Sequence, residues 1–255
     1  MKVGICIVHY GEQKLLDDCL KSLYDGGVKR FEVGMDRAVF EESILNCNKN
    51  NLGFTAGNNQ LIVEFLNGSG LNKFDWIWLL NNDTVVPKET LESIEKLLPT
   101  LTNGLLDLSN IGVIGFKILS LDNSDLIHHG GTIECYPAGI HKSGSVKLKQ
   151  LNKRTYEKWV TFASVLIRRE VFETVGLLDN RFFNYFSDSD FCYRARNAGF
   201  KVIYEPSFVI SHKIGQSQNP SPEQIKILQS DSIKFQDKWI NGKNFFDLEK
   251  ELIVN

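Results

Sequence analysis

Apolar residues follow two patterns in the first half of the chain: short unbroken runs and longer stretches with helical spacing. The runs at Val3–Val8 and Phe74–Leu80 are largely apolar, which is typical of strands buried on both faces of a parallel sheet. After the first run, apolar side chains recur every three or four positions from Leu15 to Leu23. Strands that alternate with helices in this way predict an α/β fold, in which helices cover both faces of a parallel sheet.

The same reading extends along the chain. Further strands are expected at 31–35, 111–119, 159–170 and 201–212, the last interrupted by Pro206. Helices are expected at about 87–98, 169–175 and 187–199, and from Pro222 onward, and the turn-like stretch 50–59 is expected to lead into a helix through Leu61, Ile62 and Phe65. Residues 121–158 are rich in Gly, Ser, His and Lys and predict only short, antiparallel pieces. We expect one domain over 1–217, with 218–255 as a helical extension packed on it.

The last predicted helix carries several large apolar side chains. We expect Ile225, Leu228, Ile233 and Trp239 to dock on the body of the domain. The alternative is that an apolar face of this helix, including Phe235, rests on a membrane surface.

Composition narrows the function classes. The chain has 255 residues, a net charge of -2 and a pI near 6.2, with no basic run, so nucleic acid is not an expected partner. Five cysteines without a CxxC spacing argue against a disulfide framework and a structural zinc site, and favour buried free thiols in a cytoplasmic protein. No stretch approaches the ~18 apolar residues of a membrane-spanning helix.

Polar side chains follow the apolar run that ends at Leu80. Asn81, Asn82, Asp83 and Thr84 come directly after it, and in parallel sheets ligands bind at the carboxyl ends of strands. A carboxylate among amides suits a hard divalent cation that also binds a phosphate. The alternative is a turn in which Asp83 or Thr84 caps the next helix.

Aromatic residues precede two carboxylates in the stretch Phe182–Phe191. Asp188 and Asp190 lie near the start of a predicted helix, where capping alone could explain them. The functional interpretation is a general base beside an aromatic pocket that could stack on a sugar ring. A helix N-terminus lowers the pKa of a carboxylate, whereas burial raises it.

Two further features carry weaker signals. His212 ends an extended segment and becomes a metal-ligand candidate only if the fold brings it to Asp83. The stretch "NLGFTAGNN" could bring backbone N–H groups to an anion, but it matches neither the P-loop nor the dinucleotide-binding fingerprint.

Taken together and in order, these stretches resemble the family-two inverting glycosyltransferases of GT-A fold, closest to the bacterial rhamnosyltransferase-like branch. The resemblance covers roughly Lys2 to Ser217. It rests on "VGICIVHYGEQKLLDDCLKSL", "NLGFTAGNN", "WLLNNDTVVP" and "GLLDNRFFNYFSDSDFCYRARNAGFKVIYEPSFVISH". It implies a Rossmann-like, mostly parallel central sheet flanked by helices, with a smaller antiparallel portion on the acceptor side.

The resemblance also implies roles for residues. Asp188 would be the catalytic base, and Asp83 with His212 would hold Mg²⁺ or Mn²⁺ on the donor diphosphate. Ser187, Asp190, Phe162 and Trp159 would support the acceptor side. The donor nucleotide would be bound by Val8, His9, Tyr10, Asp36, Asn51, Gly53, Asn58, Asn81 and Asn82.

The implied activity is transfer of a sugar from a nucleoside diphosphate, dTDP- or UDP-linked, to a glycan or lipid-linked oligosaccharide in surface polysaccharide synthesis, at the inner face of the cell membrane. The chain departs from the family pattern at Ser187, where Glu is usual, and at Phe162, where a small residue is common. These departures motivate an alternative, a nucleotide-sugar or glycan-binding protein with impaired catalysis. A sugar nucleotidyltransferase is a further alternative, although no Gly-rich triphosphate loop lies near the N-terminus.

Overall fold

The computed structural model describes residues 2–28, 51–67, 74–102, 110–129, 132–133, 140–213 and 220–241. The strands are β1 (Val3–Cys6), β2 (Trp76–Leu80), β3 (Thr84–Val85), β4 (Ile111–Ser120), β5 (Leu126–His129), β6 (Thr132–Ile133), β7 (Ile140–His141), β8 (Gly144–Ser145), β9 (Thr155–Tyr156), β10 (Ser164–Arg168) and β11 (Lys201–His212). The helices are α1 (Gln13–Asp25), α3 (Gly53–Asn67), α4 (Lys88–Thr102), α5 (Arg169–Val175), α6 (Ser187–Asn197) and α8 (Pro222–Phe235), with a 3-10 helix at Lys149–Asn152 and a π-helix at Gln236–Asn241.

The central sheet has the strand order β1-β2-β10-β4-β11-β3. β1 pairs parallel to β2 and β4 pairs parallel to β11, while β10 lies antiparallel between β2 and β4. β1, β2, β4 and β11 therefore run in one direction, and β10 and β3 run against them. The prediction of a mostly parallel α/β sheet is confirmed. The short strands expected for residues 121–158 are antiparallel, since β5 pairs with β4, β8 with β5, and β9 with β11.

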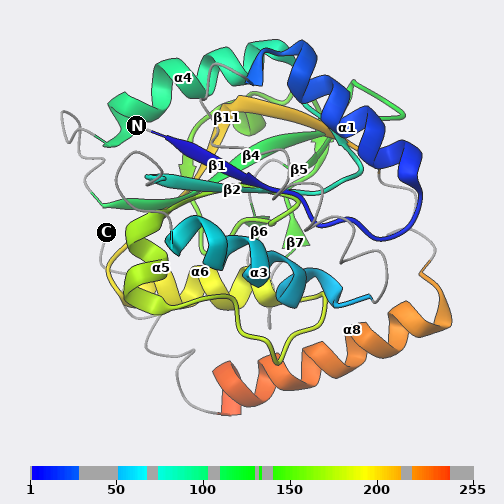
Figure 1. Cartoon of the computed structure of the whole chain (residues 1–255), viewed down its shortest axis with the longest axis vertical. Helices are drawn as coiled ribbons and strands as arrows, with labels where there is room; N and C mark the ends of the chain where they lie inside the picture. The colour runs from blue at the N-terminus through cyan, green and yellow to red at the C-terminus, as the bar shows by residue number, and fades with distance from the viewer. Residues whose placement is uncertain are drawn as a thin grey trace.

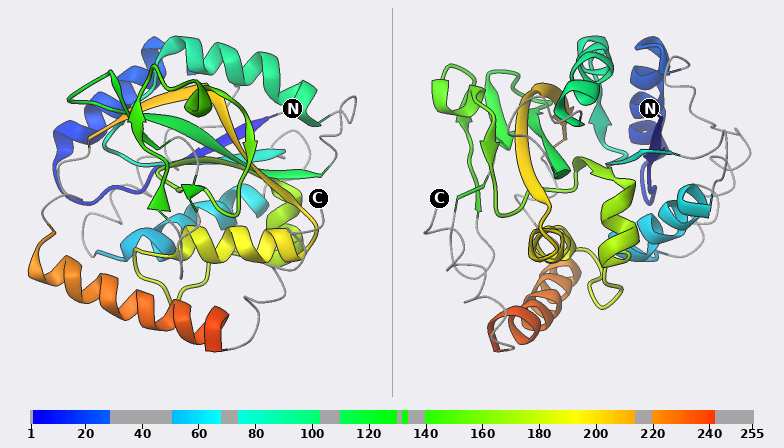
Figure 2. Two further views of the ribbon diagram at one scale, coloured as in Figure 1. Left: turned by 180° about the vertical axis from the view of Figure 1, so that it is seen from behind. Right: turned by 90° about the vertical axis from the view of Figure 1, so that its left-hand side faces the viewer.

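Helices cover both faces of this sheet, as Figure 1 shows. α1 and α4 lie on one face, and α3, α5 and α6 lie on the other (Figures 1 and 2). β2 shows why its sequence is apolar throughout: Trp76, Trp78 and Leu80 pack with α1 and α4, whereas Ile77 and Leu79 pack with the opposite helices. A strand in the middle of such a sheet has no solvent face, so alternation disappears from its sequence.

β11 carries an irregularity at Pro206. Its register with β4 shifts between Glu205 and Val209, so the residues between them have no partner on β4. Thr90 of α4 compensates, since its hydroxyl donates to the carbonyl of Val209 and accepts from the N–H of the same residue. The strand therefore continues past the proline and delivers His212 to the far end of the sheet.

The C-terminal helix docks through a different face from the predicted one. Pro222 is the first residue of α8, as expected, and Trp239 is buried. Ile225, Leu228 and Ile233 are 40%, 39% and 60% exposed, so the prediction for these three residues is wrong. The buried face consists of Asp231, Phe235 and Trp239, spaced four residues apart. The pattern of apolar residues did not predict this face because one of its three residues, Asp231, is a carboxylate.

The other expectations have mixed outcomes. Cys6, Cys19 and Cys192 are buried free thiols, as predicted, while Cys47 and Cys135 lie outside the described residues. The strand predicted at 31–35 and the nucleotide contact predicted for Asp36 also lie outside them. Among the described residues, no helix is long and apolar enough to cross a bilayer.

Candidate active site

The turn at Asn81–Thr84 follows β2 and leads directly into β3. The N–H of Asn81 donates to the carbonyl of Ala163 at 2.9 Å, and the Thr84 hydroxyl donates to the carbonyl of Asn81 at 2.7 Å. α4 begins only at Lys88. Thr84 therefore closes the turn instead of capping a helix, and the alternative of a helix cap is wrong for this residue.

Strand pairing brings Asp83 and His212 together. β3 pairs antiparallel with the end of β11, with His212 opposite Thr84, and the N–H of Lys213 donates to the carbonyl of Asp83 at 3.1 Å. His212 Nε2 lies 3.0 Å from Asp83 Oδ1, but the two atoms are not aligned as a hydrogen bond, and Asp83 Oδ1 is buried without a hydrogen-bond donor.

His9, which follows β1, contacts the same turn. Asn82 Nδ2 lies 2.7 Å from His9 Nδ1, and because an amide N–H can only donate, that ring nitrogen is the acceptor. Burial lowers the pKa of His9, which is consistent with a neutral ring. Val8 is half-buried and Tyr10 is exposed. The predicted donor-side residues of β1 thus adjoin the turn through His9.

The stretch "NLGFTAGNN" builds the N-terminus of α3, which begins at Gly53, so the prediction of a turn up to Asn59 is wrong beyond residue 52. Asn51 Oδ1 accepts from the N–H of Gly53 at 2.9 Å, and the Asn58 side chain donates to the carbonyl of Phe54. Gly53 has φ +75°, and a Cβ there would lie 2.4 Å from the carbonyl oxygen of Phe183. In this structure Asn51, Gly53 and Asn58 shape the helix start and its contact with residue 183.

Asp188 lies in the first turn of α6 and is half-buried. Burial raises its pKa to about 6, against the opposing effect of backbone N–H groups of Ser189, Asp188 and Phe162. The N–H of Ser189 donates to Oδ1 at 2.8 Å. A carboxylate that titrates near neutral pH is suited to accept a proton.

Residues 162 and 163 connect Asp188 to the Asn81–Thr84 turn. The backbone N–H of Phe162 faces the Asp188 carboxylate and lowers its pKa, and the carbonyl of Ala163 accepts from Asn81. The two sites therefore lie on either side of one short segment. The Phe162 ring is buried against Phe191, and Trp159 is buried in the same core cluster. Both rings are thus buried, and Phe162 faces Asp188 through its backbone.

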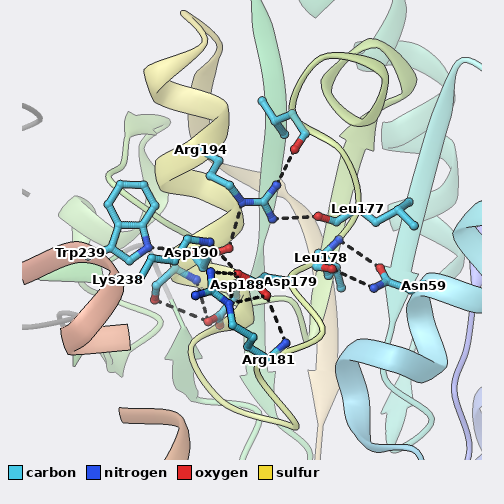
Figure 3. Close-up of polar contacts among 12 residues, drawn as sticks. Asn59, Leu177, Leu178, Asp179, Arg181, Asp188, Asp190, Arg194, Lys238 and Trp239 are labelled. Carbon is cyan, nitrogen blue, oxygen red and sulfur yellow. Dashed lines mark hydrogen bonds and ion pairs between the residues drawn. The ribbon is translucent and has the colours of Figure 1, made fainter. Parts of the chain in front are cut away.

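Asp190 faces away from this chemistry, although it is two residues from Asp188. It is fully buried and accepts hydrogen bonds from Arg194 at 2.9 Å and from the Trp239 indole at 2.8 Å, and Lys238 lies 2.5 Å from it (Figure 3). Lys238 also contacts Asp179, whose carboxylate binds Arg181. Asp190 thus joins α6 to the C-terminal segment. Ser187 is buried as the first residue of α6.

The aromatic cluster before Asp188 packs mainly inward. The ring centroids of Phe182 and Phe186 lie 6.4 and 5.2 Å from that of Phe235 on α8. These two rings therefore join the segment before Asp188 to α8.

Sequence reasoning did not identify Asn59 or Asp231 as part of this region. Asn59 on α3 exchanges two hydrogen bonds with the backbone of Leu178 (Figure 3), and Asp231 on α8 binds the backbone of residues 183–185. No local signal marked Asp231, because a lone Asp on a helix is ordinarily solvent-exposed.

The sequence matches the profile described as "Glycosyltransferase like family 2" over residues 47–229, which is more than half of the chain. This chain belongs to that family. The match contains the Asn81–Thr84 turn, Asp188 and His212, so the geometry above is that of a family 2 domain. No curated protein matches the sequence significantly.

Solved structures of similar fold are glycosyltransferases that share 11–12% identity with the chain. GalNAc-T7 with UDP, GalNAc and Mn²⁺ has a TM-score of 0.55 at 12% identity, covering 84% of this chain and 44% of that one. TarS of S. aureus has 0.51 at 11%, covering 92% and 40%. The mannosyltransferase PcManGT of Pyrobaculum calidifontis, with GDP-Man and Mn²⁺, has 0.51 at 12%, covering 84% and 57%.

These likenesses establish the GT-A fold of the family 2 domain. The chain spans 40% to 57% of the length of the three structures, so they extend beyond the part that it matches. The rhamnosyltransferase-like branch is a finer assignment than this fold likeness supports.

Proposed function

We propose that this family 2 domain is a metal-dependent inverting glycosyltransferase, which moves a hexosyl group from a nucleoside diphosphate to a hydroxyl of a glycan or lipid-linked acceptor. The observation that carries the proposal is the bridge at residues 162–163. It joins a carboxylate with a pKa near 6 to a turn whose Asp83 oxygen accepts no hydrogen bond. A base beside a diphosphate site is what one direct displacement requires.

Asp83 and His212 fit a divalent cation. Adjacent ligands of an octahedral ion bound at about 2.1 Å lie about 3.0 Å apart, as the Asp83 oxygen and the His212 nitrogen do. The described residues hold no group of three or more His, Cys, Asp or Glu side chains suited to a metal, so the diphosphate and water would complete the coordination. Mg²⁺ or Mn²⁺ held there would supply Lewis-acid stabilisation of the departing diphosphate.

Asp188 would act as the base in the proposed reaction. It takes the proton from the acceptor hydroxyl while that oxygen forms a bond to the anomeric carbon of the sugar. The bond from the anomeric carbon to the diphosphate oxygen breaks in the same step, and its electron pair leaves with the nucleoside diphosphate. One displacement inverts the configuration at the anomeric carbon, so no enzyme nucleophile is needed.

The donor and acceptor follow from family resemblance and neighbours. UDP and GDP-Man accompany two of the neighbours in their solved structures. For this chain we propose a dTDP- or UDP-linked donor, bound at the ends of β1 and β2 by His9, Asn81 and Asn82, with Asp36 at the base or ribose. We further propose a role in bacterial surface polysaccharide synthesis, with peripheral contact to the inner face of the membrane.

The impaired-catalysis alternative was motivated by Ser187 and Phe162. The Phe162 ring is buried in the core beside Phe191, which weakens that motive. Ser187 is itself buried as the first residue of α6. Asp188 keeps its contacts beside it, which favours an active enzyme.

The test first measures nucleotide binding and then measures sugar transfer. The melting temperature is measured with UDP, dTDP, GDP and CMP, each with Mn²⁺ and with EDTA, since a ligand of the folded state raises it. We expect a metal-dependent rise with one nucleotide, absent in Asp83→Ala and retained in Asp188→Asn. Sugar release and transfer from the matching donor are then followed, and Asp188→Asn must abolish them. Binding without turnover in the unaltered protein would favour the alternative.

A further inference from the structure

The segment 177–186, which leads into Asp188, is held by polar side chains from three helices. Asn59 of α3 donates to the carbonyl of Leu178 at 2.8 Å and accepts from its N–H at 3.0 Å. Arg194 of α6 donates to the carbonyl of Leu177 at 2.9 Å. α8 contributes the third contact, and Figure 1 shows this segment descending from α5 and α6 to meet that helix.

The contact from α8 is a buried carboxylate. Asp231 is fully buried, and its Oδ2 accepts from three consecutive N–H groups, those of Phe183 at 3.0 Å, Asn184 at 2.9 Å and Tyr185 at 3.1 Å. Its Oδ1 pairs with Lys234 at 2.9 Å. Hydrogen bonds to an ionised acceptor are about twice as strong as neutral ones, so this set fixes the path of the backbone.

The same helix also contacts the residue that follows. Phe186 has φ +63°, a left-handed conformation that is unfavourable for a non-glycine residue and persists only where its surroundings enforce it. Its ring packs on Phe235, which is one helical turn beyond Asp231. Phe186 is also the residue before α6, so its conformation sets the direction in which α6 starts.

We propose that Asp231 is a positioning residue: together with Phe235 it makes α8 hold the turn at 183–186 so that Asp188 is aimed at the acceptor hydroxyl. The proposal rests on the proposed function of Asp188 as base. Asp188 is the second residue of α6, so any change in the backbone at Phe186 moves its carboxylate. A displacement of about 1 Å in a reacting group can lower a rate about 100-fold.

The test compares Asp231→Asn with Asp237→Asn. The first variant keeps the shape of the side chain but replaces an accepting oxygen with an amide N–H group. The second makes the same chemical change at an exposed residue of the C-terminal π-helix that contacts Asn241. We expect Asp231→Asn to lower kcat at least tenfold, with donor KM and the Kd for Mn²⁺ with the stabilising nucleoside diphosphate unchanged within twofold. Asp237→Asn should match the unaltered protein in all three.

A second measurement does not depend on turnover. The carboxyl ¹³C signal of Asp188, identified by its loss in Asp188→Asn, reports the titration of that group directly. The groups around it are the Phe162 N–H, Ser189 and the Cys192 thiol, none of which the substitution alters. We expect a midpoint near pH 6 in the unaltered protein and in Asp237→Asn. In Asp231→Asn the midpoint should fall by at least half a pH unit because the loosened turn admits water.

Three results would overturn the inference. They are a folded Asp231→Asn protein with normal kcat, one with an unmoved Asp188 midpoint, and one that loses diphosphate binding together with turnover. If Asp231→Asn does not fold, Phe235→Leu is used instead, because it weakens the contact with Phe186 in the same turn. This variant must also lower kcat and the Asp188 midpoint. If the unaltered protein transfers no sugar but the midpoint moves in Asp231→Asn, the proposed function fails while the positioning contact stands.

Discussion

The Asn81–Thr84 turn and the segment 177–186 carry the two halves of the proposed chemistry, and they are built in opposite ways. Backbone pairing holds the turn, because β2 leads into it, β3 leaves it, and Ala163 and Lys213 bond to its peptides. Side chains hold the segment, since Asn59, Arg194 and Asp231 bind its peptides from three different helices. We infer that the metal side tolerates side-chain substitutions around it, whereas the base side depends on them.

The largest effect is expected at the base itself. Asp188→Asn should lower kcat/KM by about 10²–10⁴-fold, the usual contribution of a general base. Diphosphate binding at the Asn81–Thr84 turn should persist, because Asp188 touches that turn only through residues 162–163. Titration calorimetry measures diphosphate binding and initial rates measure kcat/KM, on the same preparation. A variant that also lost the diphosphate would show that the two regions are not separable.

Asp190 gives the matched comparison on stability. Asp190→Ala leaves Lys238 and Arg194 without their buried partner and should cost about 3–5 kcal/mol of unfolding free energy. Asp18→Ala, which removes an exposed pair with Lys14, should leave the unfolding free energy almost unchanged. Urea unfolding measures both. Equal losses would contradict the assignment of Asp190 to a buried network.

Asn59 tests whether side chains hold the base side. Asn59→Leu strips the Leu178 peptide of both partners in a buried setting and should cost about 1–3 kcal/mol, with kcat reduced as well. Gln60→Ala, at the exposed neighbour, should leave both unchanged. Urea unfolding measures the change in unfolding free energy, and steady-state rates measure the change in kcat. An Asn59 variant with unaltered stability would mean that the remaining contacts suffice.

The pKa of Asp188 has a consequence for pH. Activity should fall about tenfold for each unit below pH 6, as the carboxylate becomes protonated. For stability, a raised pKa means that the folded state favours the protonated form. The ionised group therefore destabilises the protein above pH 6, by on the order of 1–2 kcal/mol after allowance for its partial exposure. Asp188→Asn should melt at a higher temperature than the unaltered protein at pH 8, and equally at pH 3, below the ordinary carboxyl pKa of 3.8. A higher melting temperature at both would point to another cause.

The smallest effect is expected at the Asn81–Thr84 turn. Thr84→Val removes a hydrogen bond to the carbonyl of Asn81 and should cost about 1 kcal/mol, while metal-dependent diphosphate binding stays within threefold. Cys19, which also contacts Thr84, still fills the space beside it. Loss of diphosphate binding in this variant would show that the turn depends on side chains after all.

Sequence patterns predicted those elements whose structure depends on residues close together in the chain. The unbroken apolar runs identified β1, β2 and β4, and Pro222 and Gly176 marked the start of α8 and the end of α5. Asp83 was a candidate because it follows a buried strand. His212 became its neighbour only through the pairing of β3 with β11, which the sequence left as a condition.

The contacts missed by sequence reasoning are polar and distant along the chain. Asp231 binds peptides 46 to 48 positions away, and Asn59 binds one 119 positions away. A lone Asp or Asn on a helix is ordinarily solvent-exposed, so nothing local distinguishes these two. The buried face of α8 was missed for the same reason, and the Phe162 ring turned inward because Phe191 offers it a core position.

The placement of β10 has a consequence for how the chain is made. β2 and β4 never touch as neighbours, because Val165 of β10 lies between Leu79 and Gly115. While the ribosome has delivered both flanking strands but not residues 164–168, each of them presents an unpaired edge, the kind of surface on which chains aggregate. The nascent protein therefore needs this strand to join β2 to β4, and fragments that end before it should collect in insoluble material.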